Sequence, residues 1–217
     1  MKGAEMRRIR VLIVDDYELV RAGLRTLLAA DPEIEVVAEA ANGTQALALA
    51  RERRPEVVLL DAHLPDIGGA EVCQQLHGEV PGVAVVMLTT FSDDELVRRC
   101  VRAGADGYLL KDIERLDLGR NIRALARGEA VIDPKVAPLV LAAARLAGPA
   151  GESDQPLTER QRDVLQFVAE GRSNREIAER MYLSELTVKG YIEEILRQLG
   201  ARNRVHAAIL ATKRGWI

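Results

Sequence analysis

Short apolar runs, each ending in a polar or charged residue, recur along the first half of the chain. The clearest is Val57–Leu60, four apolar residues in a row, which predicts a strand buried on both faces, as in a parallel sheet. Similar runs predict strands over 10–14, 35–40, 83–88 and 108–110. Segments with helical character follow the strands and predict helices over 18–30, 43–53, 70–76, 93–103 and 113–127. Five strands that each lead into a helix predict an α/β fold with a doubly wound five-stranded parallel sheet.

Helix-start signals are dense near the C-terminal end. Thr158-x-x-Gln161 and Ser173-x-x-Glu176 are capping boxes, and Ser184 is placed to cap a further helix. Together they predict a small all-α domain with helices near 159–170, 174–181, 185–199 and 203–213. The turn over 182–184 has the length found in a helix-turn-helix. A generic four-helix domain would carry the same caps, so capping alone leaves both interpretations open.

Residues 129–156 separate these two patterned regions. An Ala- and Leu-rich stretch predicts a helix over 134–147, and Gly148–Pro156 has the composition of a flexible linker. The helix could be a spacer, or it could dock on the first domain. We therefore expect domains over 8–128 and 157–217, joined by a linker over 129–156.

Charge is distributed unevenly between the two expected domains. Residues 1–128 carry 17 Lys/Arg and 21 Asp/Glu, whereas residues 157–217 carry 11 and 8, which indicates different partners for the two parts. No run approaches the roughly 18 apolar residues of a membrane span. No apolar signal segment precedes the first strand, so we expect a cytoplasmic protein without a membrane partner. The chain has no P-loop, GxSxG or HExxH pattern, which argues against most common enzyme classes.

Polar side chains stand at the carboxyl ends of the first, third, fourth and fifth predicted strands. In strand order they are Asp15 and Asp16, Asp61, Thr89, and Lys111. Taken alone, Asp61 could be a capping aspartate at a strand–loop junction. The ligand crevice of an open α/β sheet, however, lies just beyond the strands' carboxyl ends, so we expect these residues to converge. Carboxylates gathered there suit Mg²⁺, and a lysine and a hydroxyl beside it would bind an incoming phosphoryl group.

The first half of the chain resembles the receiver domain of two-component response regulators, a flavodoxin-like fold, over about residues 8–128. The resemblance rests on Asp15-Asp16, on LLDAHLP around Asp61, on LTT at Thr89, and on GYLLK with Tyr108 and Lys111. It implies Asp61 as the phosphoacceptor. It also implies a Mg²⁺ site made of Asp16 and Asp61 directly, Asp15 through water, and the backbone carbonyl of His63. Lys111 is then expected to pair with phosphoryl oxygens, with Thr89 and Tyr108 as the switch pair.

The stretch LTERQRDVLQFVAEGRSNREIAERMYLSELTVKGYIEEILRQLG closely resembles the LuxR-type helix-turn-helix of the NarL/FixJ regulators. The resemblance covers about 157–213 and implies binding to double-stranded DNA. TVKGYIEE departs from the family's usual TVKxH, because Tyr191 replaces His and Glu193-Glu194 put acids on the recognition helix. Glu193 could accept a hydrogen bond from a cytosine, or it could be a surface acid paired with Lys189 and Arg197. The expected DNA contacts are Ser184, Thr187, Lys189, Gly190, Glu193 and Arg197.

We therefore expect a phosphorylation-controlled transcription factor without enzymatic activity of its own. Its expected partners are a sensor histidine kinase or a small phosphodonor, a second copy of the chain on activation, double-stranded DNA and, as a further candidate, RNA polymerase. One alternative is a phosphorylation-independent DNA-binding regulator with a vestigial receiver, against which the complete Asp, Thr and Lys set argues. Another is a Mg²⁺-dependent aspartyl-phosphate phosphatase, which would need an acid where His63 stands.

Overall fold

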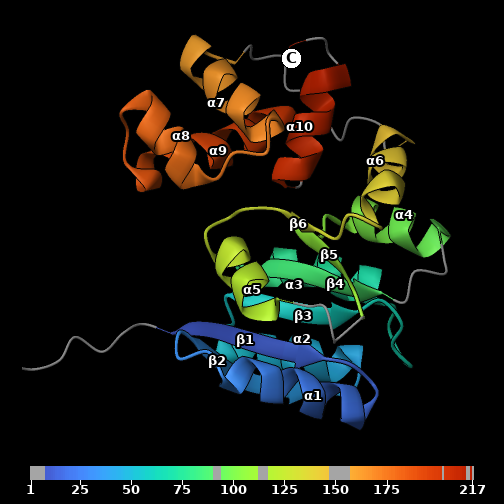
Figure 1. Ribbon diagram of the computed structural model, residues 1–217. Helices are drawn as coiled ribbons and strands as arrows, with labels where there is room; N and C mark the ends of the chain where they lie inside the picture. Colours follow the sequence, from blue (N-terminus) through green and yellow to red (C-terminus); the bar gives the residue numbers. More distant parts are fainter. Residues whose placement is uncertain are drawn as a thin grey trace, which may run out of the picture.

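A parallel sheet forms the first part of the molecule, and a helical domain forms the second (Figure 1). The computed structural model describes residues 8–89, 94–111, 117–146, 157–201, 203–213 and 216. The sheet has six strands in the order β2-β1-β3-β4-β5-β6. In chain order they are β1 (Ile9–Val14), β2 (Ile34–Ala40), β3 (Val57–Asp61), β4 (Ala84–Thr89), β5 (Gly107–Leu110) and β6 (Val131–Ile132). The sheet and the helices packed on it are called the sheet domain below.

Helices cover both faces of the sheet. On one face lie α1 (Glu18–Ala29) and α5 (Leu118–Ala126); on the other lie α2 (Gly43–Arg53), α3 (Gly69–Glu79) and α4 (Asp94–Ala103). Alternate residues of β1 enter different cores: Val11 and Ile13 pack with α1 and α5, whereas Leu12 and Val14 pack with the other helices. Because both faces are buried, the strands are continuous apolar runs rather than alternating ones.

The sixth strand corrects the expected number of strands. Residues 131–132 were expected to be linker, but Val131 pairs with Gly107 and Ile132 with Tyr108. A strand of two residues is too short to give a recognisable period in the sequence, and β5 supplies the pairing partner that only the fold reveals. The chain therefore stays with the sheet domain beyond residue 128.

The helix after β5 has a capped start, and the linker helix is docked. Helix α5 begins at Leu118, where Asp117 caps it by accepting a hydrogen bond from the Arg120 backbone N–H at 3.2 Å. The part of the expected helix over 113–116 lies outside the described residues. Helix α6 (Ala137–Leu146) lies inside the expected 134–147 and packs on α4, with Val140 buried in the core that α4 also enters. Of the two roles left open for this helix, the structure has the docked one. The expected start of the α4 helix at residue 93 and the flexible linker over 148–156 lie outside the described residues.

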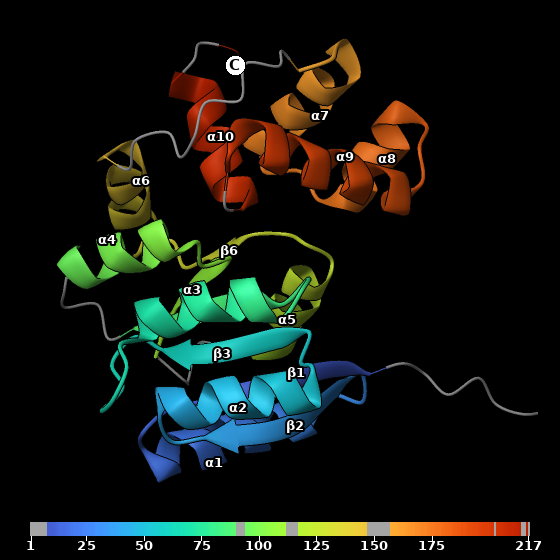
Figure 2. The same cartoon turned by 180° about the vertical axis from the view of Figure 1, so that it is seen from behind.

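The helical domain matches the expected helices to within one residue at each end. Its elements are α7 (Glu159–Ala169), α8 (Asn174–Met181), α9 (Glu185–Leu199) and α10 (Arg204–Lys213). Both capping boxes are formed, at Thr158 and at Ser173, and Ser184 caps α9. The helical domain lies beyond the β6 edge of the sheet, with α10 near α6 (Figures 1 and 2). Within the described part of the chain, no helix is long and apolar enough to cross a membrane.

The loop that follows β3 is tied to the start of α2 by Asp66. Its carboxylate accepts hydrogen bonds from the backbone N–H groups of Gly43 at 2.8 Å and Thr44 at 2.9 Å, and from the Thr44 hydroxyl at 2.7 Å. These bonds, led by that of the Thr44 hydroxyl, hold the pKa of Asp66 well below its ordinary value of 3.8. Asp66 therefore satisfies free N–H groups of α2 and fixes the loop that carries residues 61–65.

We predict that Asp66→Ala lowers the midpoint of thermal unfolding at pH 7, whereas Asp66→Asn, which keeps one acceptor oxygen, lowers it less. A carboxylate with a depressed folded-state pKa stabilises the fold above the unfolded-state value and loses that contribution as the pH falls toward the folded-state value. The difference between wild type and Asp66→Ala should therefore be constant from pH 7 to about 5 and shrink below pH 4. Thermal scans at several pH values check this, and a difference that grows on acidification would contradict it.

Candidate functional site

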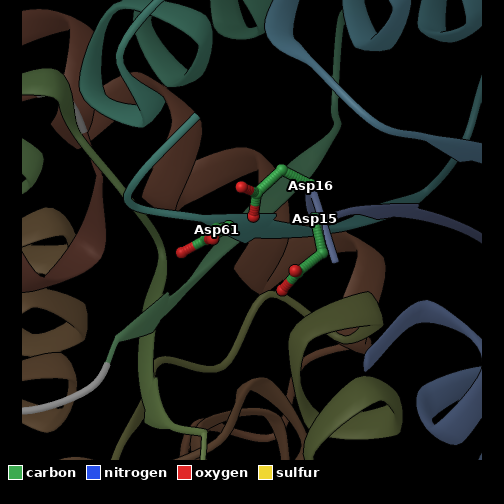
Figure 3. A group of neighbouring side chains, drawn as sticks. All are labelled: Asp15, Asp16 and Asp61. Carbon is green, nitrogen blue, oxygen red and sulfur yellow. The ribbon is translucent and has the colours of Figure 1, made fainter. Parts of the chain in front are cut away.

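Three carboxylates gather where β1 and β3 end. Val14 is paired with Leu60, so Asp15 and Asp61, the next residues on each strand, lie side by side. One carboxylate oxygen from each of Asp15, Asp16 and Asp61 lies within 4.8 Å of the others (Figure 3). Asp15 and Asp61 are buried and Asp16 is exposed, so the cluster opens to solvent on one side.

Lys111 places its charge between two of these acids. Its Nζ lies 2.7 Å from Oδ2 of Asp15 and 2.7 Å from Oδ2 of Asp61. Burial raises the pKa of Asp61 above its ordinary value, although the hydrogen bond from Lys111 opposes this. Burial would lower the pKa of Lys111, but its bonds to both aspartates outweigh this effect and raise the pKa. The ammonium group therefore offsets the repulsion between the buried carboxylates.

The strands next to the cluster supply Thr89 and Tyr108. Thr89 ends β4 and is buried, and its backbone carbonyl accepts a hydrogen bond from Lys111 N–H at 2.9 Å. Tyr108 is only 2% exposed, packed in the core that α4 and α6 share. It also lines a small void together with Val140 of α6 and Asn203 at the start of α10. Tyr108 is thus already buried where the sheet domain, the linker helix and the helical domain meet.

His63 lies in the loop directly after the cluster. Its backbone N–H donates to Oδ1 of Asp61 at 3.1 Å, and its side chain is exposed. The peptide N–H of His63 therefore orients the Asp61 carboxylate, and the imidazole is directed to solvent. The expected role of the His63 carbonyl as a metal ligand remains a prediction.

Helix α9 carries the residues expected to contact DNA. Val188, Ile192, Ile195 and Leu199 are buried, so the opposite side of the helix, with Lys189, Gly190, Glu193 and Arg197, is exposed. At its start, Ser184 Oγ accepts from the Thr187 N–H at 3.0 Å and lies 2.7 Å from Thr187 Oγ1, which ties these two hydroxyls together. A Cβ added at Gly190 would meet no atom within 4 Å, so internal packing does not require glycine here.

The ion pairs on α9 differ from the surface stripe considered for Glu193. Arg197 Nε donates to Glu194 Oε2 at 3.2 Å, so Arg197 pairs with Glu194 rather than with Glu193. Glu193 and Lys189 instead line a cleft of about 450 Å³, whose opposite wall includes His77 and Asp106 of the sheet domain. The helix face expected to contact DNA is therefore turned partly toward the sheet domain.

Polar side chains of the helical domain hold the two domains together. Asn203 Nδ2 donates to the carbonyls of Gly104 at 3.0 Å and Ala105 at 2.7 Å, in the turn between α4 and β5. Asn174 Nδ2 donates to the Arg127 carbonyl at 2.9 Å, and Arg204 Nη1 to the Gly128 carbonyl at 3.0 Å. We call Asn174, Asn203 and Arg204 the domain latch. Sequence reasoning missed it, because polar residues at helix starts give the same signal whether they cap a helix or reach another domain.

Two family models match the chain. The model of the response regulator receiver domain matches residues 11–123, and that of the bacterial regulatory proteins of the luxR family matches residues 155–211. The chain is 38% identical over 205 residues to the DNA-binding transcriptional activator DevR/DosR of Mycobacterium tuberculosis, with 94% of each chain covered. It is also 38% identical over 203 residues to the transcriptional regulatory protein LiaR of Bacillus subtilis, with 94% of this chain and 96% of LiaR covered.

Two solved structures resemble this chain over nearly its whole length. The response regulator ChrA of a heme-sensing two-component system is 33% identical, with a TM-score of 0.53 over 97% of this chain and 99% of ChrA. RcsB in a complex with DNA is 21% identical, with a TM-score of 0.56 over 95% of this chain and 98% of that one, a likeness in fold.

We predict that Lys111→Met lowers the free energy of unfolding at pH 7 by up to about 3 kcal/mol, because it leaves Asp15 and Asp61 buried without their cation. Burial raises the folded-state pKa of Asp61 above its unfolded-state value, so in the variant this carboxylate destabilises the fold once it is ionised. The loss should therefore be largest near neutral pH and shrink on acidification as Asp61 takes up a proton. Urea unfolding at pH 7 and pH 5 checks both points.

The exposed Lys135 offers a matched control, since Lys135→Met removes a lysine from a surface position. It should change the free energy of unfolding by less than about 0.5 kcal/mol. Equal stability of Lys111→Met and wild type at pH 7 would show that the ammonium group is not needed to hold the buried acids.

Proposed function

Since the chain belongs to the response regulators that join a receiver domain to a LuxR-type DNA-binding domain, and so is a two-component transcriptional regulator, we propose that phosphorylation of Asp61 controls its binding to DNA. The receiver would span residues 8–128 and the DNA-binding domain residues 157–217. The observation that carries the proposal is the position of Lys111, within 2.7 Å of Asp61 and next to Thr89. An aspartate flanked by a cation and a hydroxyl can accept a phosphoryl group and have the added charge neutralised.

The donor set at this edge of the sheet fits Mg²⁺. Oxygens of Asp15, Asp16 and Asp61 come within 4.8 Å of one another, and they are the hard ligands that Mg²⁺ prefers. We propose Asp16 and Asp61 as direct ligands, Asp15 through water, and the His63 carbonyl as a further ligand. When bound, the ion would offset charge on the phosphoryl oxygens. Asp61 supplies the attacking oxygen, Lys111 pairs with a phosphoryl oxygen, and Thr89 donates its hydroxyl to another.

The start of α1 offers a surface for the protein that delivers the phosphoryl group. Tyr17 and Leu19 are exposed and lie within three residues of the acidic pair, so they offer an apolar surface beside it. We propose that a sensor histidine kinase docks there, while a small phosphodonor would need no such surface. Both would act in the cytoplasm, where the DNA is.

The domain latch offers a route from Asp61 to the DNA-binding face. Tyr108 contacts the same small void as Asn203, and Asn203 holds the turn that ends α4. We propose that movement of Thr89 toward the phosphoryl group shifts Tyr108 and α4, which loosens the bonds from Asn203 to Gly104 and Ala105. The released helical domain would then move away from the other wall of the cleft that Lys189 and Glu193 line, which would give DNA access to this face of α9.

The released domains would bind DNA as a homodimer. Two copies of α9 would enter successive major-groove faces about 34–36 Å apart. Lys189 and Arg197 would contact phosphates, Ser184 and Thr187 would lie at the helix start that faces the backbone, and Gly190 would allow close approach. We favour direct readout of a cytosine by Glu193, since Arg197 pairs with Glu194 and leaves Glu193 outside that ion pair. The DNA-bound dimer would in turn contact RNA polymerase.

The relatives bear on the alternatives. DevR/DosR and LiaR are transcriptional regulators by name, which supports a regulator rather than a phosphatase. The contacts of Lys111 with two buried acids support a working receiver rather than a vestigial one.

We predict that Asp61→Asn abolishes labelling by acetyl phosphate, because an amide at this position is not a phosphoryl acceptor. Labelling of the wild type should require Mg²⁺ and stop in EDTA. Asp163→Asn, which changes an exposed acid of the helical domain, should label as the wild type does. Phosphate incorporation followed by mass spectrometry measures this. Full labelling of a folded Asp61→Asn chain would refute the assignment.

We predict that Asn203→Asp opens the domain latch without phosphorylation. The variant keeps the oxygen that caps α10 by accepting from the His206 N–H at 2.8 Å, but it loses the two bonds to Gly104 and Ala105. Two hydrogen bonds of about 1 kcal/mol each predict a gain of up to roughly thirtyfold in the DNA affinity of the unphosphorylated chain. The affinity after full phosphorylation should stay unchanged, and that comparison serves as the internal control. An unphosphorylated variant that binds DNA no better than wild type would contradict the latch.

A further inference from the structure

Arg21 on α1 reaches back to the backbone of the acidic pair. Its Nη1 donates to the carbonyl oxygen of Asp15 at 2.7 Å and to that of Asp16 at 3.2 Å. The side chain is 15% exposed, so most of it is withdrawn from solvent. A guanidinium group has several donors in a fixed plane, and here one of its nitrogens holds two consecutive carbonyls in place.

Those two carbonyls set where the acidic side chains lie. The Asp15 carboxylate is further held by the Tyr17 N–H at 3.0 Å and by Lys111 at 2.7 Å. Asp16 is exposed, so the direction of its carboxylate depends mainly on its backbone. Without Arg21, the turn after β1 would lose the side-chain contacts that fix the peptide groups of both residues.

A cation beside a metal site would by itself repel a divalent ion, and Glu39 on β2 offsets that charge. Glu39 Oε2 lies 3.8 Å from Arg21 Nε, and Oε1 lies 2.6 Å from Arg25 Nη1. The Arg25 side chain is 56% exposed and forms an ion pair with Glu39. The two arginines therefore share an acid, but Arg21 is the one that holds the carbonyls of the acidic pair.

We propose that Arg21 is a positioning residue for the chemistry at Asp61: it fixes the backbone of Asp15 and Asp16 so that both carboxylates face Asp61, while Glu39 offsets its charge. The inference rests on the proposed Mg²⁺ site. Positioning and simple electrostatics predict opposite effects of removing Arg21. Loss of a neighbouring positive charge alone would tighten binding of a divalent cation, whereas loss of a positioned backbone would weaken it.

The test measures the dissociation constant of Mn²⁺, a spin-active substitute for Mg²⁺, by electron paramagnetic resonance on the full chain, with competition by Mg²⁺. Arg21→Ala should raise the dissociation constant at least fivefold. Arg21→Lys keeps the charge but replaces the guanidinium with a single ammonium group, and it should raise the constant by a smaller factor. Arg25→Ala should stay within twofold of wild type, because it removes an equal charge that pairs with the same acid, Glu39, without touching the acidic pair.

A salt series separates positioning from electrostatics, and thermal unfolding of each variant checks that it is folded. Glu39→Gln should weaken Mn²⁺ binding at low salt and regain affinity as salt rises, since its effect is electrostatic, whereas the loss in Arg21→Lys should persist at high salt. Tighter binding in Arg21→Ala, or wild-type binding in a folded Arg21→Lys, would overturn the positioning role alone. A wild-type chain that binds no Mn²⁺ would overturn the Mg²⁺ site together with it.

Discussion

Burying carboxylates next to one another is the constraint on which the receiver depends. Asp15 and Asp61 are drawn together by the register of two parallel strands, and each leaves water when the sheet is covered by helices. Their repulsion is offset by one ammonium group, which arrives from β5 on the far side of β3 and β4. Strand order, strand length and the position of Lys111 therefore cannot change independently. The charge balance of such a site depends on a single cation, so a further change of charge there alters the balance strongly.

The same balance links the site to the rest of the molecule. The backbone N–H of Lys111 is hydrogen-bonded to the Thr89 carbonyl. Two residue pairs before the Thr89–Leu110 pair, Tyr108 lies beside Met87 in the core that α4 and α6 cover. Helix α6 buries Val140 against this core and ends near the helical domain. A small rearrangement at the carboxyl end of β4 and β5 thus meets packed side chains rather than solvent. Packed layers of this kind pass on a displacement because they cannot compress.

Much of this architecture could be predicted from the sequence, and the exceptions have physical causes. The apolar runs, the acids that end them and the capping boxes are local patterns. These patterns predicted α2, α8 and α9 to the residue and β3 to within one residue. The strand β6 forms because β5 offers an edge to pair with, and a strand of two residues is too short to show a hydrophobic period in the sequence. Asn203 and Arg21 act through contacts with backbone carbonyls far away or on a preceding turn, and carbonyls have no sequence signature. Sequence therefore predicted which side chains gather at the carboxyl ends of the strands and missed those that hold them in place.

The cleft lined by Lys189 and Glu193 has a consequence for dosage in the cell. Under the proposed control, the receiver competes with DNA for one face of α9, and it does so from within the same chain. The strength of such a competitor is an effective concentration set by the tether, so it is independent of how many copies are made. The DNA affinity of the resting chain is lowered by the fraction of open molecules, and overproduction leaves that fraction unchanged. Pairing of two copies, in contrast, rises with expression. The latch therefore weakens DNA binding by the same factor at every expression level, and only a change that opens the latch alters that factor.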